Sequence, residues 1–187
     1  KIKYEENLKT IQKQIKQIEN LVNEFSDFAR MPKPLLKKNN LYEVINENIG
    51  LLNKIDQTIT IKLINHISKD SYLNFDYEQF NRLFFNLIKN SIESIQQKAQ
   101  KDSKINKNID IEIRGRRDYI IINLFDTGIG FKNKNTKDLI KPYFTTKEKG
   151  TGLGLSIVDK IISDHNGSIN FSNHKNGAKI QIIIPKN

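Results

Sequence analysis

The sequence predicts a two-layer α/β fold, in which helices cover one face of a mixed β-sheet, preceded by one coiled-coil-like helix. Three observations lead to this prediction. Residues 1–30 contain neither glycine nor proline and repeat apolar residues at steps of three and four. Beyond them, helical patterns are interleaved with short alternating segments typical of half-buried strands. The 187 residues, 37% of them hydrophobic, suffice for one packed domain with an appendage.

The first 30 residues are expected to form one helix with an apolar seam. Such a regular 4-3 spacing is the a/d pattern of a coiled coil, here over about three heptads. The positions between are mainly Lys, Gln, Asn and Glu, so the seam needs a partner helix; packing on its own domain is the alternative. The seam consists of Tyr4, Leu8, Ile11, Ile15, Ile18, Val22 and Phe25.

A linker is expected at 31–40, because Pro32 and Pro34 lack amide hydrogens and restrict the residues before them. The second domain is then expected over 41–187. Ile59, Ile61 and Leu63 alternate as in a strand, and Gly115 joins two further strands. We predict helices at about 41–54, 77–99 and 152–165. They are expected to lie on one face of a single sheet, whose strands are near 58–64, 72–75, 110–114, 119–125, 168–172 and 178–184.

Composition excludes several classes of protein. The chain has no cysteine, which rules out disulfide scaffolds, thiol catalysis and cysteine-ligated metals. Its three histidines, His66, His165 and His174, are irregularly spaced and are expected to be surface or packing residues. Apolar runs such as 182–184 are too short to cross a bilayer. The net charge of +10 comes mainly from lysine in a Lys-, Ile- and Asn-rich background, so we expect no nucleic-acid partner.

The helix at 77–99 carries a polar strip. Asn86, Lys89, Asn90 and Glu93 fall within an arc of about 100°, at 100° per residue. An asparagine oxygen is a neutral hard ligand, suited to a Mg²⁺ ion that also binds phosphate. A solvated helix face would have the same pattern. The opposite side is apolar, with Phe80, Leu83, Phe84, Leu87, Ile88 and Ile95.

Asp126 follows an apolar strand and opens the sequence Asp-Thr-Gly-Ile-Gly. An ionised carboxylate only accepts hydrogen bonds, so at a strand end it can bind an exocyclic amine such as that of adenine. Gly128 and Gly130 would let a flat ring approach the backbone without a Cβ in the way. An ordinary strand-end turn is the alternative.

A second glycine segment, Gly150–Ser156, runs directly into a helical pattern. Glycines there leave amide hydrogens and the positive helix end available to phosphate, although neither a Walker nor a Rossmann motif is present. Between the two segments, Phe144 and Lys147 are candidates for a lid anchor and a phosphate contact, or else surface residues. The long irregular stretch from Asp126 to Thr151 is typical of a functional lid.

These motifs, in this order, strongly resemble the ATP-binding domain shared by gyrase, Hsp90, bacterial histidine kinases and MutL, the GHKL (Bergerat) type. They look most like four motifs of sensor histidine kinases. The Asn86–Asn90 strip resembles the N box, Asp126–Gly130 the first glycine box, Phe144–Lys147 the F box and Gly150–Gly154 the second glycine box. The resemblance implies that this is the catalytic (HATPase) domain of such a kinase. The segment from Glu24 to Pro34 is similar to the end of the second dimerisation helix in nitrogen-regulation, NtrY-like kinases.

The resemblance implies the role of each matching residue. Asn90 would ligand Mg²⁺, Asn86 would support the metal and phosphates, and Asp126 would bind the adenine amine. Lys147 would face the γ-phosphate, so Asn86 and Lys147 are the catalytic candidates. The remaining ATP-binding candidates are Lys89, Gly128, Gly130, Phe144, Gly150, Thr151, Gly152, Leu153 and Gly154, with Glu93 at a flanking N-box position.

The resemblance also implies cofactors and partners. ATP with Mg²⁺ would donate its γ-phosphate to a histidine of a dimerisation domain, and from there to an aspartate of a response regulator. The full protein would be a homodimer, with this part in the cytoplasm and a membrane anchor elsewhere. In these kinases the acceptor histidine precedes the helix matched by 1–30. We therefore expect an excised piece, holding one dimerisation helix, that binds nucleotide without autophosphorylating.

Two departures from the family pattern bear on function. The family's ATP hydrolases carry a glutamate where this chain has Asn86, and an amide cannot take up a proton at neutral pH. Phosphoryl transfer is thus favoured over hydrolysis. The segment from Gly177 to Ile180 lacks the usual threonine and phenylalanine, so nucleotide affinity can differ. A GHKL-type ATPase and a dimerisation module with a degenerate nucleotide site are the alternatives.

Overall fold

The computed structural model describes residues 2–68, 72–132, 136–145, 147, 150–175 and 177–186, without the side chains of 2–4, 6, 17, 20 and 27. Along the chain, helices and strands follow nearly the predicted order. The elements are α1 (Ile2–Ala29), β1 (Lys37–Asn40), α2 (Leu41–Leu52), β2 (Thr60–Asn65), β3 (Tyr72–Phe75), α3 (Tyr77–Ala99), β4 (Asn108–Gly115), β5 (Tyr119–Asp126), the 3₁₀ helix η1 (Thr136–Ile140), α4 (Gly154–Asp164), β6 (Ser168–His174) and β7 (Gly177–Pro185).

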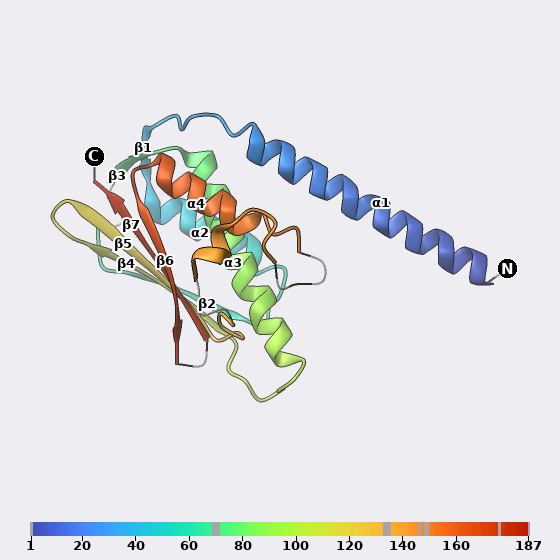
Figure 1. Ribbon diagram of the computed structural model, residues 1–187. Helices are drawn as coiled ribbons and strands as arrows, with labels where there is room; N and C mark the ends of the chain where they lie inside the picture. Colours follow the sequence, from blue (N-terminus) through green and yellow to red (C-terminus); the bar gives the residue numbers. More distant parts are fainter. Residues whose placement is uncertain are drawn as a thin grey trace.

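A five-stranded mixed sheet forms one layer, in the order β2-β4-β5-β7-β6. Strand β2 runs parallel to β4, and the other neighbours are antiparallel. Helices α2, α3 and α4 lie together on one face of this sheet (Figure 1). The predicted two-layer fold is therefore confirmed.

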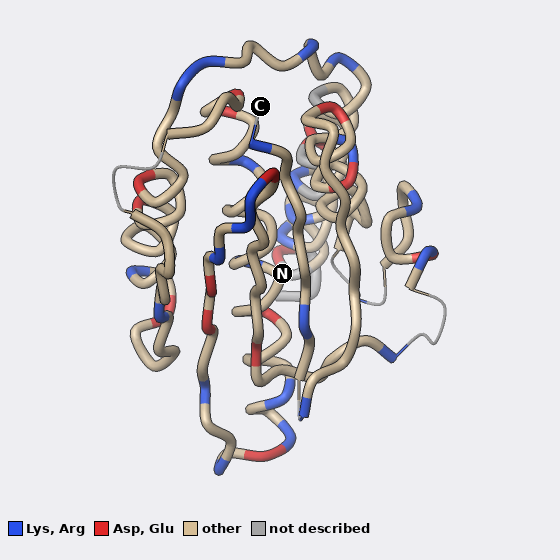
Figure 2. Tube along the Cα trace, turned by 90° about the vertical axis from the view of Figure 1, so that its left-hand side faces the viewer, with Lys and Arg blue, Asp and Glu red and all other residues tan. Residues whose placement is uncertain are grey.

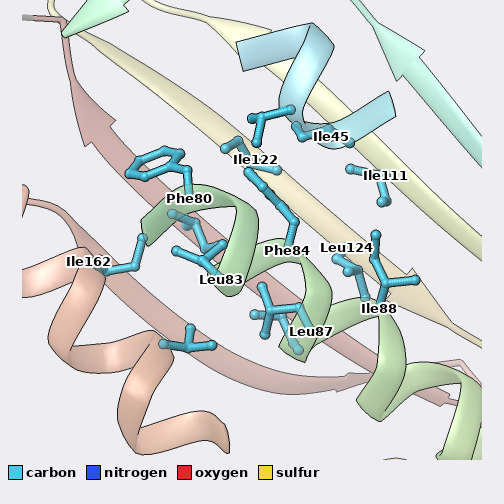
Figure 3. Close-up of a cluster of buried hydrophobic side chains, with 14 of the residues drawn as sticks. Ile45, Phe80, Leu83, Phe84, Leu87, Ile88, Ile111, Ile122, Leu124 and Ile162 are labelled. Carbon is cyan, nitrogen blue, oxygen red and sulfur yellow. The ribbon is translucent and has the colours of Figure 1, made fainter. Parts of the chain in front are cut away.

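The core lies between α3 and the sheet. Phe80, Phe84 and Leu87 on α3 are buried against alternate residues of the central strands, including Ile111 and Ile122 (Figure 3). Burying side chains of this size stabilises the fold by about 1.5–3 kcal/mol each. This packing determines which side of α3 faces away from the sheet.

The prediction of a single sheet and of a linker throughout 31–40 was wrong. Strand β1 lies inside that range and pairs antiparallel with β3, so that Lys37 is opposite Phe75, in a separate two-stranded sheet. The side chain of Asn39 also donates to the carbonyl of Phe75 at 2.8 Å. The sequence of β1, Lys-Lys-Asn-Asn, has no apolar alternation and so gives no local signal of a strand. This segment is a strand because it pairs with β3, which is distant in the chain.

Helix α1 extends away from the rest of the molecule (Figure 1). Its seam is exposed from Leu8 to Phe25, with Ile15 at 59% and Ile18 at 60% exposure; the side chain of Tyr4 lies outside the described residues. Among its described side chains, Phe28, near the end of the helix, is the one that packs on the core, and it is half-buried. An exposed apolar stripe of this length is typical of a helix that pairs with another.

Charged residues are distributed over the whole trace. Figure 2 shows Lys and Arg along strands, helices and loops, interleaved with Asp and Glu. The excess of basic residues is therefore not carried by one element. No helix in the described part of the chain has an apolar stretch long enough to cross a membrane.

His165 joins the end of α4 to the start of α3. Its side chain is buried, and Nε2 accepts a hydrogen bond from the amide of Asp76 at 3.0 Å. Nδ1 therefore carries the hydrogen, which it donates to the carbonyl of Ile161 at 2.7 Å. The ring also packs edge-on against Phe80. His165 is thus a packing residue, whereas His66 and His174 are exposed, as predicted.

Replacing His165 by alanine should lower the free energy of unfolding by about 2–4 kcal/mol, because it leaves a cavity and an unpaired amide at Asp76. Urea denaturation measures this change. The exposed His66→Ala variant is the control and should change stability by about 0.5 kcal/mol or less. Equal effects of the two substitutions would contradict the packing role.

Candidate functional site

One cavity of about 340 Å³ brings together all four predicted motifs. It lies beside the polar side of α3, and its volume is within the range of small-molecule sites. Of the predicted site residues, Gly128 and Leu153 do not line it. In the F-box segment, residues 142–147, Thr146 lies outside the described residues. The predicted residues that line the cavity are Asn86, Lys89, Asn90, Asp126, Gly130, Phe144, Lys147, Gly150, Thr151, Gly152 and Gly154.

The polar strip of α3 faces the cavity because the other side of the helix is buried in the core. Asp76 begins α3 as its N-cap, with its carboxylate accepting from the amide of Gln79 at 3.0 Å. About three turns after this N-cap, the side-chain nitrogen of Asn86 donates to the carbonyl of Arg82 at 2.8 Å. A Cβ on Gly154 would lie 3.2 Å from the oxygen of Asn86. The glycine segment therefore packs directly on this strip.

Lys147 reaches the same strip from the F-box segment. Its ammonium donates to Oδ1 of Asn90 at 2.9 Å and forms an ion pair with Glu93. Lys89 also lines the cavity, with its ammonium 5.9 Å from the centre of the Phe85 ring. The strip thus presents amide and carboxylate oxygens that bind a cation.

Asp126 ends strand β5 and is 7% exposed. Backbone amides of Gly128 and Ala178 donate to its Oδ1 at 2.9 and 3.2 Å, and the hydroxyl of Ser91 donates to Oδ2 at 3.1 Å. Burial raises the pKa of the Asp126 carboxyl, and the two backbone hydrogen bonds partly oppose that rise. Because a carboxylate has about four lone-pair sites, it can accept a further donor from the cavity.

Three residues of α3 that were not predicted from the sequence hold Asp126 and the loop that follows it. Besides Ser91, the hydroxyl of Ser94 accepts from the amide of Ile129 at 3.1 Å. The ammonium of Lys98 donates to the carbonyls of Thr127 and Gly128, both at 3.0 Å. The residues of this Ser91–Ser94–Lys98 ridge are three and four positions apart, and this helical spacing is the signal by which the sequence indicates them.

Glycine is required at position 128 because the loop approaches α3 closely. A Cβ there would lie 2.1 Å from the hydroxyl oxygen of Ser94 and 2.9 Å from its carbonyl carbon. Gly130 adopts φ +68°, and its Cβ would lie 2.7 Å from the side-chain oxygen of Asn173. Contacts within the protein therefore account for both glycines. Their expected place beside an adenine ring stays a prediction.

The second glycine segment packs against the F-box segment. Gly152 has φ +72°, and a Cβ there would lie 2.5 Å from the carbonyl carbon of Tyr143. Leu153 is fully buried in the core and precedes α4 without a side-chain hydrogen bond to cap the helix. Such a helix start next to a cavity is suited to an anion.

Helix α1 also contributes to this cavity. Glu24 lines it and accepts a hydrogen bond from the hydroxyl of Thr151, one of the predicted nucleotide contacts. The ring of Phe25 stacks on Tyr143, with 6.3 Å between ring centres. Neither contact could be read from sequence, because the residues of each pair are more than a hundred positions apart in the chain.

Residues 75–187 match the family described as histidine kinase-, DNA gyrase B-, and HSP90-like ATPase. The chain belongs to this family. The resemblance predicted from the motifs is thereby confirmed, and the domain is a catalytic ATP-binding domain of the sensor histidine kinase type.

Individual relatives agree with this assignment. The nitrogen regulation protein NtrY of Azorhizobium caulinodans is 31% identical over 90% of this chain and 21% of its own. A putative NtrY-like sensor histidine kinase of Rickettsia felis is 31% identical over 97% of this chain and 29% of its own. The solved catalytic domain of histidine kinase ThkA is 27% identical, with a TM-score of 0.70 over 81% of this chain and 95% of that one. The chain thus spans less than a third of the length of the NtrY protein and of the NtrY-like kinase.

Replacing Lys98 by methionine should lower the free energy of unfolding by about 1–3 kcal/mol, because two carbonyls of the Asp126 loop lose a charged donor. Chemical denaturation measures the loss. Lys101→Met, at an exposed position in the turn that follows the same helix, is the control. If both variants are equally stable, Lys98 does not hold the loop.

Proposed function

We propose that this domain binds ATP with Mg²⁺ and, within the full protein, donates the γ-phosphate to a histidine on a dimerisation helix. From there the phosphoryl group would pass to an aspartate of a response regulator. The observation that carries the proposal is the single cavity shared by the α3 strip, Asp126, Lys147 and the second glycine segment. Phosphoryl transfer depends chiefly on positioning and charge neutralisation, which these groups supply.

Each end of the cavity suits a different part of ATP. The acceptor-only carboxylate of Asp126 is suited to the adenine amine, and its three protein donors fix its orientation. Lys147 and the uncapped start of α4 are suited to the phosphates. The nucleotide would therefore lie along α3, from the ridge at Ser91 toward Asn86.

The residues present also fit Mg²⁺. The side-chain oxygen of Asn90 lines the cavity and already accepts from an ammonium. Neutral and anionic oxygens are the ligands that Mg²⁺ takes together with substrate phosphates. When bound, the ion would neutralise charge on the β- and γ-phosphates. Asn90 would hold it, and Asn86 would orient the phosphates next to it.

Transfer is favoured over hydrolysis by the side chains at the phosphate end. Asn86 cannot act as a general base at neutral pH. In the described part of the cavity the carboxylates are Glu24, Glu93 and Asp126. Each already accepts a hydrogen bond from the protein: Glu24 from Thr151, Glu93 from Lys147 and Asp126 from Ser91. An ATPase would need one of them to activate water.

The exposed seam of α1 supports the dimerisation part of the proposal, with residues 1–30 as one helix of a bundle. A response-regulator partner is supported by a solved complex of histidine kinase ThkA with response regulator protein TrrA. That structure is 23% identical to this chain, with a TM-score of 0.73. The acceptor histidine, the membrane anchor and the inability of this piece to autophosphorylate stay predictions.

Nucleotide should stabilise the fold. The Mg²⁺ complex of AMPPNP, at about a hundredfold excess over its Kd, should raise the Tm by about 5–10 °C, because binding to the folded state alone adds about 2.7 kcal/mol. Differential scanning fluorimetry measures the shift. Its absence at millimolar nucleotide would leave only the degenerate dimerisation module.

Replacing Asp126 by asparagine should weaken ATP binding about tenfold or more, because the amide nitrogen cannot accept from the adenine amine. The fold should persist, since the asparagine oxygen can accept from Gly128 and Ala178, and Ser91 can accept from its nitrogen. Calorimetric titration measures the Kd, with Asp110→Asn, outside the cavity, as the control. Parent-like affinity of Asp126→Asn would remove the adenine contact from this proposal.

A further inference from the structure

A positive charge already lies against the strip where a metal ion is expected. The ammonium of Lys147 donates to the side-chain oxygen of Asn90 at 2.9 Å and to the carboxylate of Glu93. Asn90 and Glu93 are three residues apart on α3, so their side chains project from the same side of the helix. Two hard oxygens from one helix thus converge on one cation.

We propose that Asn90 and Glu93 together form a cation subsite, which Lys147 fills in this structure and Mg²⁺ fills when nucleotide binds. Glu93 then belongs to the metal site, and Lys147 moves from Glu93 to the γ-phosphate. This inference rests on the proposed ATP-binding function. It goes beyond that function in two ways. It assigns the Glu93 carboxylate as a second protein ligand of the metal, and it identifies the Lys147 ammonium as a cation that competes with the metal for the subsite.

Charge balance favours the exchange. A triphosphate beside Glu93 is repelled unless a cation lies between them, and in the described part of the cavity the lysines are Lys89 and Lys147. If Lys147 contacts the γ-phosphate, Glu93 loses its ion-pair partner. A divalent ion on Asn90 and Glu93 restores the balance, and a carboxylate is a preferred Mg²⁺ ligand.

The exchange also costs little. The side chains of Lys147 and Glu93 are 36% and 38% exposed, and ion pairs with that much solvent contact contribute little net stability. An ammonium has three donors and no fixed direction, so Lys147 can turn from the carboxylate to a phosphate oxygen. Lys147 and Glu93 therefore each keep an oppositely charged partner in both states.

The test compares AMPPNP affinity in Mg²⁺ with its affinity in EDTA, by calorimetric titration of each variant. Glu93→Gln should reduce the Mg²⁺ dependence about fivefold, because metal-free binding improves and metal-bound binding weakens. Lys147→Met should increase the Mg²⁺ dependence, because the competing ammonium is lost while Glu93 still needs a cation. Glu78→Gln, the same substitution on the same helix outside this cavity, should leave the dependence unchanged.

The outcomes separate this inference from the proposed function. If Glu93→Gln weakens binding equally with and without Mg²⁺, Glu93 only anchors Lys147, and the inference is overturned while ATP binding stands. An increase of Mg²⁺ dependence in Glu93→Gln would overturn it too. If the unmodified chain binds AMPPNP under neither condition, the proposed function itself fails.

Discussion

The packing of α3 against the sheet is the constraint on which the site depends. Phe80, Phe84 and Leu87 are buried in the core, so the helix cannot rotate about its axis without exposing them. With that rotation excluded, Asn86 and Asn90 must face the cavity. The Ser91–Ser94–Lys98 ridge, which begins directly after Asn90, must then meet Asp126 and the loop that follows it.

Burial and hydrogen bonding act in opposite directions on Asp126. Burial favours the neutral acid and raises its pKa, whereas the amides of Gly128 and Ala178 and the hydroxyl of Ser91 favour the carboxylate. The position is therefore costly in stability unless the loop after Asp126 and the start of β7 are both in place. A carboxyl held in this way has a defined orientation, which a free surface aspartate lacks.

Hydrogen bonds and one ring contact link α1 and α3 to the F-box and second glycine segments. Glu93 lies beside Lys147, and Glu24 of α1 accepts from Thr151 of the glycine segment. Phe25, a member of the exposed seam, stacks on Tyr143 of the F-box segment. The helix proposed for dimerisation and the proposed nucleotide site therefore share contacts, and a change in one alters the surroundings of the other.

The sequence by itself determined the elements whose signal is local. Helical periodicity predicted α3 over 77–99 and the polar strip from Asn86 to Glu93, and the motif order predicted the family. Only the tertiary structure decided the pairing of β1 with β3, the close approach that requires Gly128, and the partners of Lys98 and Lys147. These features join segments far apart in the chain. Periodicity describes one segment at a time, whereas such contacts depend on how the whole core packs.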